Sequence, residues 1–365
     1  MNFNSVVFRV DSSRQIGSGH LMRCLALARV LKKAGAKCSF VSRALDGNLN
    51  GFVSSEGFTL IELPKSQVPI PKPGKSEPVH SNWREAGWEI DALETLKAVS
   101  NQKVDWLIVD HYGLWESWHI VMRGCDAKIM VIDDLADRKH DCDLLLDQNL
   151  GSDFELYRDL IPLECRSFFG PDYALLRPEF SDYRESSLKR RHEGKIDHIL
   201  LNFGGGDPSD YIGKTLGALL NVDIPHHVTI SIIYGGLATM TSGHQYLISC
   251  MPVKVKIYGA VTNMAEILSS CDLVIGAAGG SAWERCCLGV PSLVFPVALN
   301  QVNIAKSLST FGVSTVLGAR DLANGKFEST FSNMFQKENL RIMSCKASSI
   351  CDGTGVVKII RELNA

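Results

Sequence analysis

His20, at the start of a predicted helix, is a candidate general base. In the stretch FRVDSSRQIGSGHLMRC, His20 follows Gly17 and Gly19, and a segment with helical spacing of apolar residues starts there. The partial positive charge of a helix N-terminus lowers the pKa of an imidazole, which keeps the ring neutral and able to accept a proton. The two glycines also permit close approach of a ligand to the backbone. The alternative is a histidine that only packs or forms a hydrogen bond at a helix start.

Polar residues also follow two strongly apolar segments in the first half. VDHYG brings Asp110, His111 and Tyr112 to the end of a predicted strand, where one or two of them could lie beside His20. IDD, residues 132–134, ends the next predicted strand. Its carboxylates could orient a histidine or simply cap the local backbone.

A glycine-rich loop follows a predicted strand at the start of the second half. FGGGDP contains Gly204, Gly205 and Asp207 after the apolar HILLN. Consecutive glycines leave backbone N–H groups available for an anion, and the dipole of a following helix adds to their effect. The alternative is a tight turn that needs glycine for its geometry.

Two more loops have the same strand-to-helix position. AAGGSAWE places Ser281 after Gly280 as an N-cap or a phosphate ligand, and Glu284 has the spacing of a capping box. The functional alternative for Glu284 is a carboxylate that accepts hydrogen bonds from two ribose hydroxyls. In PVALNQ, Asn300 and Gln301 could cap a helix or contact polar groups of a sugar.

Several other chemistries are disfavoured by the same residues. A dinucleotide fingerprint requires a third glycine where the chain has Met22, and an acidic residue where it has Arg43, so NAD is not expected. The sequence has no ATP-type P-loop and no G-x-S-x-G nucleophile elbow. No His, Asp, Glu or Cys group has metal-ligand spacing, so we expect neither a metal nor a cofactor.

The elements that must position these residues alternate along the chain. Short apolar segments such as SVVFRV, WLIVDHY, HILLNF and DLVIGAA alternate with helical segments, which indicates parallel sheets covered on both faces. We expect an α/β protein with two doubly wound, Rossmann-like domains, residues 1–182 and 196–365, facing a cleft. The charged stretch 183–195 reads as a solvated linker. Residues 64–82 are rich in Pro, Lys and Ser and read as a loop, functional or disordered.

Composition places the chain among ordinary globular proteins. It has 365 residues, 45% of them hydrophobic, and a net charge of −2, which gives no reason to expect a nucleic-acid or membrane partner. The 11 cysteines are scattered without C-x-x-C pairs, so we interpret them as buried thiols of a cytoplasmic protein. No signal peptide or membrane-spanning run is evident.

Taken together, these motifs resemble a known family. DSSRQIGSGHLMRCLALA, VDHYGL, IDDLADRKHDCDLLLDQN, FGPDYALLRPEF, FGGGDP and GGSAWERCCLGVPSL are similar to the UDP-sugar hydrolases of pseudaminic acid biosynthesis. The resemblance runs from about Val6 to Phe311. That family in turn resembles the GT-B glycosyltransferases. It implies hydrolysis of UDP-2,4-diacetamido-2,4,6-trideoxy-β-L-altropyranose, with a small-molecule UDP-sugar as the partner.

The resemblance also implies roles for individual residues. His20 matches the proposed general base, and Tyr112 and Asn300 match residues near the sugar. Nucleotide contacts are implied for a second set: Gly204 to Asp207 for the pyrophosphate, Ser281 for phosphate, Glu284 for ribose, and Val261, within the segment Tyr258 to Met264, for the uracil.

The implied mechanism requires no strong general acid at the leaving group. UDP departs readily, so loop N–H groups that stabilise its charge suffice, and a base on the opposite face activates water. We therefore expect inversion at the anomeric carbon, no covalent intermediate and no requirement for metal. Two alternatives stay open: an inverting glycosyltransferase with a UDP-sugar donor, and a non-catalytic UDP-sugar sensor. The sequence does not resolve the configuration of the sugar or the oligomeric state.

Overall fold

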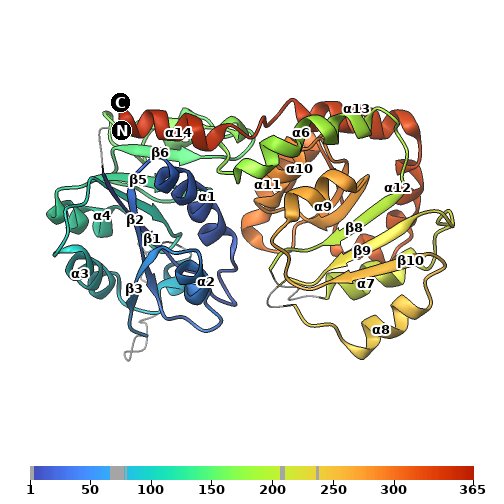
Figure 1. Ribbon diagram of the computed structural model, residues 1–365, viewed down its shortest axis with the longest axis horizontal. Coiled ribbons are helices and arrows are strands. Elements are labelled where there is room, and N and C mark those ends of the chain that lie inside the picture. Colours follow the sequence, from blue (N-terminus) through green and yellow to red (C-terminus); the bar gives the residue numbers. More distant parts are fainter. Residues whose placement is uncertain (1–3, 66–77, 79, 206–209, 236–237) are drawn as a thin grey trace. The chain divides into compact units, whose positions relative to one another are not determined.

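The computed structural model describes residues 4–65, 78, 80–205, 210–235 and 238–365. The chain divides into two compact units, Met1–Leu176 with Gly355–Ala365, and Arg177–Thr354. Each unit contains one parallel β-sheet with helices packed against it (Figure 1). The predicted α/β class and the predicted parallel sheets are confirmed.

The first unit has a seven-stranded sheet in the order β3-β2-β1-β4-β5-β6-β7. Its strands are β1 (Ser5–Val10), β2 (Lys37–Arg43), β3 (Thr59–Leu63), β4 (Trp106–Asp110), β5 (Lys128–Ile132), β6 (Leu144–Asp147) and β7 (Arg166–Phe169). The order reverses between β1 and β4, where Val10 pairs with Asp110. Ligands of open parallel sheets bind beyond the carboxyl ends of strands at such a reversal.

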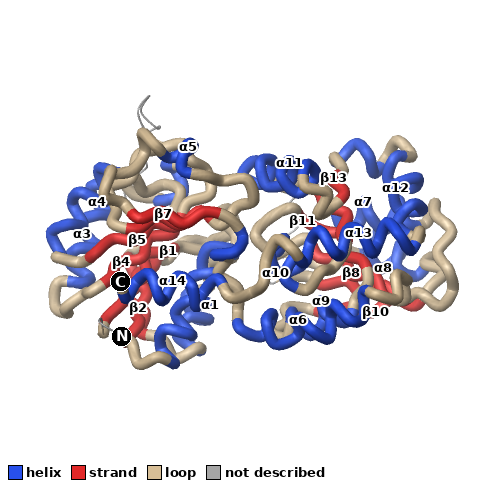
Figure 2. Tube along the Cα trace, turned by 90° about the horizontal axis from the view of Figure 1, so that it is seen from above, coloured by secondary structure: helices blue, strands red, loops and turns tan. Residues whose placement is uncertain are grey.

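Helices cover both faces of this sheet. They are α1 (Gly19–Lys33), α2 (Asn50–Ser55), α3 (Trp88–Val99), α4 (Glu116–Met122), α5 (Phe154–Tyr157) and α14 (Gly355–Asn364). Figure 2 shows α1 and α14 on one side of the strands and α3 and α4 on the other. Successive residues of β1 face these two layers: Phe8 belongs to the same buried apolar cluster as Leu25 of α1, and Val7 to the same cluster as Trp118 of α4.

The second unit has a six-stranded sheet in the order β10-β9-β8-β11-β12-β13. Its strands are β8 (His198–Asn202), β9 (Thr229–Ile233), β10 (Lys254–Tyr258), β11 (Leu273–Ala277), β12 (Ser292–Phe295) and β13 (Thr315–Val316). Its helices are α6 (Pro178–Arg191), α7 (Tyr211–Leu219), α8 (Ser242–Ser249), α9 (Met264–Ser270), α10 (Ser281–Cys287), α11 (Val302–Thr310), α12 (Lys326–Met334) and α13 (Lys337–Ser348). Here the order reverses between β8 and β11, which pair at Asn202 and Gly276.

The unit boundaries differ from the predicted domains 1–182 and 196–365. The last helix, α14, belongs to the first unit, because Val356, Ile359 and Leu363 join its core and the indole N–H of Trp106 donates to the Leu363 carbonyl at 3.1 Å. In Figure 1 this red helix lies beside α1. The sequence prediction places this segment in the second domain, which precedes it along the chain, whereas its apolar face packs in the core of the first unit.

The predicted linker 183–195 is also wrong, since most of it lies in α6. The helix has few apolar residues, and arginines attach it to the second unit instead. Arg184 donates to the Ser348 carbonyl at 2.7 Å, and Arg190 forms an ion pair with Asp272 at 2.7 Å. These contacts stabilise a helix that lacks the hydrophobic periodicity on which the prediction depended.

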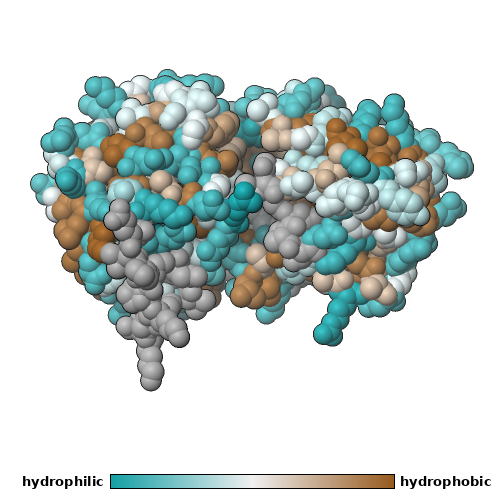
Figure 3. Space-filling model, turned by 90° about the horizontal axis from the view of Figure 1, so that it is seen from below, coloured by the Kyte–Doolittle hydropathy of each residue, from teal (hydrophilic) through white to brown (hydrophobic). Residues whose placement is uncertain are grey.

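The surface contains both hydrophilic and apolar side chains. On the face in Figure 3, apolar groups are interspersed with hydrophilic ones over each unit. Among the described residues, no helix combines the length and apolar character needed to cross a membrane. All 11 cysteines are free, and most are buried as predicted, although Cys250 and Cys345 are exposed.

Candidate functional site

His20 and Asp110 form a hydrogen-bonded pair at the strand reversal of the first unit. The Nδ1 atom of His20 lies 2.6 Å from Oδ1 of Asp110. The Asp110 side chain is fully buried and that of His20 is 8% exposed. A carboxylate only accepts hydrogen bonds, so Nδ1 carries the hydrogen, and in the neutral ring the lone pair is on Nε2. Nε2 has no hydrogen-bond partner among the residues that the structure describes, so this atom is available as a base.

Arg23 holds the same carboxylate from one helical turn further along α1. Its Nε and Nη2 atoms donate to Asp110 at 2.6 and 2.7 Å, and its Nη1 pairs with Asp134 at 2.7 Å. Burial alone would raise the pKa of Asp110, but the charge of Arg23 and the hydrogen bonds from Arg23 and His20 hold it well below its usual range. Asp110 therefore stays ionised and keeps the His20 ring in one orientation.

Tyr112 connects this pair to the end of β5. Its hydroxyl donates to Oδ2 of Asp134 at 2.6 Å, and its ring meets His20 edge-on with centroids 4.5 Å apart. Burial, followed by the charge of Asp134, raises the pKa of Tyr112 well above its ordinary value. Tyr112 is thus a neutral phenol that contacts the histidine, as the sequence suggested. Of the two alternatives for IDD, capping is confirmed for Asp133, whose carboxylate accepts from the N–H groups of Leu135 and Ala136. Asp134 contacts Tyr112 and Arg23 and not a histidine.

Two further aromatic rings complete the surroundings of His20. Trp83, in the short 3₁₀ helix Ser81–Arg84, stacks on Tyr112 at 5.1 Å and meets His20 edge-on at 6.0 Å. The ring of His80 lies 4.7 Å from Trp83 and 5.5 Å from Tyr112. Trp83 and Tyr112 thus cover part of the imidazole, and His80 packs behind them.

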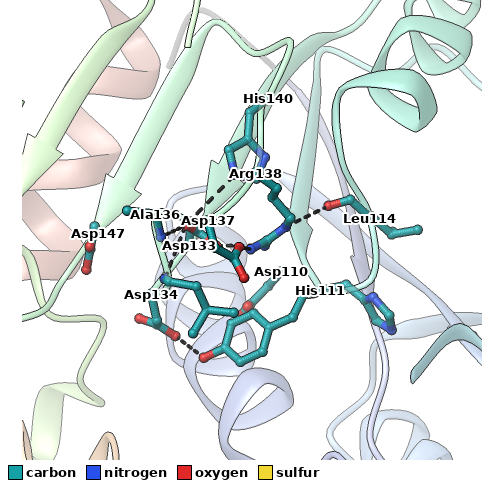
Figure 4. A network of polar contacts seen from close by, with 12 residues as sticks. Asp110, His111, Leu114, Asp133, Asp134, Ala136, Asp137, Arg138, His140 and Asp147 are labelled. Carbon is teal, nitrogen blue, oxygen red and sulfur yellow. Dashed lines mark hydrogen bonds and ion pairs between the residues drawn. The ribbon is translucent and has the colours of Figure 1, made fainter. Parts of the chain in front are cut away.

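His111 and Asp133 have structural contacts instead. His111 is buried and lies 3.3 Å from Asp11, away from His20, and its Nδ1 accepts from the Gly113 N–H at 3.0 Å. Figure 4 shows Asp133 at the centre of a network with Arg138 and the N–H of Ala136. Of the three polar residues in VDHYG, two therefore reach His20 and one does not.

The loop before α1 is closed by its own backbone. The Gly17 N–H donates to the Ser13 carbonyl at 2.8 Å, and the Ser13 hydroxyl accepts from the Ile16 N–H at 3.0 Å. A Cβ atom at Gly17 or at Gly19 would meet nothing within 4 Å. Both predicted glycine positions therefore border open space.

In the second unit, the loop after β8 is described as far as Gly205. Gly204 adopts φ +90°, a conformation that favours glycine, and its N–H donates to Oδ1 of Asn202 at 2.9 Å. A Cβ atom at Gly235, after β9, would lie 2.1 Å from the Gly204 carbonyl oxygen. Glycine is therefore required at Gly235 because the loop after β9 contacts the loop after β8. Asp207, a predicted substrate contact, lies outside the described residues.

The loop after β11 differs from the predicted cap. Ser281 is the first residue of α10, the N-cap is Gly280, and no side chain caps this helix. The capping-box interpretation of Ser281 and Glu284 is therefore wrong. The Ser281 hydroxyl accepts from Nη1 of Arg285 at 3.0 Å, which leaves its own hydrogen for another acceptor.

Glu284 has an unusual setting for a carboxylate. Burial raises its pKa to about 7, against the opposing charges of Arg177 and Arg285. In the part of the chain that the structure describes, its carboxylate has no hydrogen-bond partner. A group in this state can accept from a ligand hydroxyl.

The remaining predicted contacts of the second unit are neither caps nor core residues. Asn300 and Gln301 lie in a short 3₁₀ helix before α11, without side-chain capping. The Gln301 side chain instead accepts from the Val297 N–H at 3.1 Å. Val261 lies partly exposed between β10 and α9. The capping alternative for Asn300 and Gln301 is wrong.

Arg23 and Trp83 are the main residues that the sequence reasoning missed. Arg23 had a usable signal, because it follows His20 by three positions and so shares its helix face. Trp83 had none, since its segment adjoins the Pro-rich stretch and shows no periodicity. No three His, Cys, Asp or Glu side chains within the described ranges form a group that could hold a metal ion.

Comparisons with known proteins show which family the chain is similar to. The model of the glycosyltransferase family 28 C-terminal domain matches residues 225–359. A Campylobacter jejuni protein named UDP-2,4-diacetamido-2,4,6-trideoxy-beta-L-altropyranose hydrolase is 31% identical over 228 residues, which are 62% of this chain and 68% of the relative. This chain belongs to the family of that hydrolase. The resemblance stated from the motifs is therefore confirmed at the level of the family.

Two other similar proteins set the limits of the comparison. An uncharacterized protein of Methanocaldococcus jannaschii is 27% identical over 290 residues, which are 78% of this chain, and the chain spans about half (54%) of that relative's length. The crystal structure of MurG from Acinetobacter baumannii superposes with a TM-score of 0.71 at 15% identity, covering 99% of each chain. This chain therefore has the GT-B fold.

Proposed function

We propose that the protein hydrolyses UDP-2,4-diacetamido-2,4,6-trideoxy-β-L-altropyranose to UDP and the free sugar, with inversion at the anomeric carbon. The single observation that carries the proposal is the His20–Asp110 pair, with Nδ1 2.6 Å from the carboxylate, in a member of this hydrolase family. The role of each residue below is part of the proposal.

The first unit activates water. Asp110 accepts the Nδ1 hydrogen, and so the lone pair of Nε2 takes a proton from the attacking water. Asp110 then stabilises the imidazolium that forms. A positioned base of this kind contributes typically about 10²–10⁴-fold to the rate. Tyr112 contacts the sugar beside His20, and Gly17 and Gly19 let the sugar approach the backbone.

The second unit holds the nucleotide. The backbone N–H of Gly205, together with the hydroxyl of Ser281 beside Gly280, stabilises the charge on the departing pyrophosphate. Gly204, whose own N–H donates to Asn202, sets the direction of this loop. Glu284 accepts from the ribose hydroxyls, and the backbone near Val261 faces the uracil. Asn300 and Gln301 contact the sugar, and Asp207 adds to the phosphate loop. UDP is a good leaving group, so this scheme needs neither a strong general acid nor a metal.

A glycosyltransferase is the second candidate. The match of residues 225–359 to the C-terminal domain of glycosyltransferase family 28 supports it, since that family is named for glycosyl transfer. In that case His20 would take the proton of an acceptor hydroxyl instead of water. A non-catalytic UDP-sugar sensor would use the second unit alone and leave the Asp110–His20 pair without a role.

One experiment separates these candidates. Purified protein is incubated with the UDP-sugar and EDTA, without acceptor, and UDP release and the sugar anomer are followed by NMR. Hydrolysis predicts UDP and free sugar of inverted configuration. UDP release only after an acceptor is added would identify a transferase, and binding without release would identify a sensor.

A further inference from the structure

Tyr157 lies between two buried carboxylates of the first unit. Its hydroxyl oxygen is 2.9 Å from Oδ2 of Asp133, after β5, and 3.0 Å from Oδ2 of Asp147, at the end of β6. All three side chains are at most 2% exposed. A phenol has one hydrogen, so it can donate to only one of the two carboxylates. The second contact is a hydrogen bond only if a carboxyl group supplies the proton.

Asp133 is the carboxylate that stays ionised. Nη2 of Arg138 lies 2.6 Å from its Oδ1, and Oδ2 accepts from the N–H groups of Leu135 and Ala136 at 3.2 and 2.9 Å. Burial alone would raise the pKa of Asp133, but Arg138 holds it well below the usual range. Each hydrogen bond of Asp133 is one that a carboxylate accepts, so it offers no proton to Tyr157.

Asp147 has the opposite surroundings. Oδ1 accepts from the Asn149 N–H at 2.9 Å, and Oδ2 lies 2.6 Å from the Ser152 hydroxyl, but none of the described lysines, arginines or histidines pairs with this carboxyl group. The charged groups that face it are Asp133 and Asp134, both negative. Burial, followed by the charge of Asp134, raises the pKa of Asp147 to about 7.

We propose that Asp147 is a protonated carboxylic acid that donates to Tyr157, which donates to Asp133, and that this acid positions the polar residues next to His20. The arrangement satisfies each hydroxyl: Oδ2–H of Asp147 donates to Tyr157, and Oδ2 still accepts from Ser152. Asn149 connects Asp147 to the candidate site. Its backbone N–H donates to Asp147, and its side-chain amide donates to Oδ1 of Asp134 at 3.2 Å.

Asp134 is the point where this acid meets the candidate site. It pairs with Arg23 and accepts from Tyr112. A negative charge on Asp147 would add repulsion beside Asp134 and remove the donor to Tyr157, so the turn that carries Asn149 would shift. Asp147 is therefore a positioning residue. Its effect on activity rests on the proposed hydrolysis, whereas its protonation does not.

Infrared spectroscopy tests the protonation directly and needs no substrate. Glu284 is a second buried carboxyl group with a pKa raised to about 7, so the measurement uses a Glu284→Gln background. At pH 6 this protein should show the carbonyl stretch of a buried carboxylic acid that disappears when Asp147→Asn is added and persists with Asp223→Asn, a change at an exposed aspartate. The band should fade as the pH rises through about 7. In the Glu284→Gln background, a spectrum without such a band, or a band that remains after Asp147→Asn, overturns the proposal.

The pH profile tests the positioning role. Asparagine keeps a donor for Tyr157 without a charge, so Asp147→Asn should keep wild-type turnover at pH 6 and lose the decline in kcat that wild type shows above pH 7. Asp147→Ala, which lacks the donor, should lower kcat at both pH values without a matching change in KM. Equal alkaline declines in wild type and Asp147→Asn would refute positioning, even with the infrared band present. A protein without hydrolase activity would leave the infrared result intact.

Discussion

The two strand reversals use different physical means at equivalent places in their sheets. Between β1 and β4, charged side chains fix the chemistry, with Asp110 held by Arg23 and His20. Between β8 and β11 the backbone determines the local geometry: Gly204 adopts a conformation that favours glycine, and Gly235 lies against its carbonyl group. The first reversal suits proton transfer, which requires a definite charge state. The second suits binding of an anion, which N–H groups provide without a charge to desolvate.

The largest effect is expected when the proposed base, His20, is removed from the first strand reversal. His20→Ala should reduce UDP release by at least about a hundredfold, because a positioned general base contributes about 10²–10⁴-fold. UDP affinity, measured by calorimetry, should stay within about twofold of wild type, because the nucleotide is assigned to the second unit. His227→Ala, at an exposed histidine, is the matched control. A variant that keeps its turnover would remove His20 from the mechanism.

Neutralising the carboxylate of the pair should affect both rate and stability. Asp110→Asn leaves Arg23 buried with one carboxylate fewer, so we expect a loss of about 3–5 kcal/mol in the free energy of unfolding at pH 7, as when a buried ion pair loses a partner. The kcat should fall by about tenfold or more, because the amide can also present N–H to the imidazole. Urea unfolding and steady-state kinetics measure the two effects.

The pH dependence of this change has a definite sign. The folded pKa of Asp110 is lowered, so its stabilising contribution is present above the unfolded pKa near 3.8 and is lost as the pH falls further. The difference in stability between wild type and Asp110→Asn should therefore shrink in strong acid. A difference that grows on acidification would contradict the charge-based account of this reversal.

In the second unit, Glu284→Gln should weaken UDP binding by about tenfold, the value of a hydrogen bond to a charged acceptor. The carboxyl pKa is raised to about 7, so wild-type affinity should increase as the pH rises through 7 and the carboxylate forms. The glutamine variant should lack this increase. Calorimetric titration with UDP at pH 6 and 8 measures it, and identical pH dependences would mean that Glu284 does not contact the ribose.

The smallest effect is expected at Ser281. Ser281→Ala removes one neutral hydroxyl donor, so UDP affinity should fall by about three- to tenfold, without a change in the pH profile of turnover. Ser270→Ala, at the exposed end of α9, serves as the control. A hundredfold loss would show that this reversal depends on individual side chains as strongly as the first one does.

The sequence predicted the strands of both sheets well and the ends of the units poorly. Apolar runs such as those of β1, β4, β8 and β11 need no partner to be recognised, because each is buried on both faces. RSFF, which forms β7, was missed because its four residues are only partly buried and carry an arginine. Helix α6 was missed because arginine contacts to distant carbonyls stabilise it in place of an apolar stripe.

The sequence by itself determined which residues could do chemistry at each strand end. Periodicity placed His20, Tyr112, Gly204 and Ser281 after strands, and parallel strands bring such residues to one edge of a sheet. Only the tertiary structure decided how they are used. Burial and strand order paired Asp110 with His20, directed His111 to Asp11, and brought Tyr157 between Asp133 and Asp147. Those outcomes depend on contacts between segments far apart in the chain, and a local pattern contains no information about them.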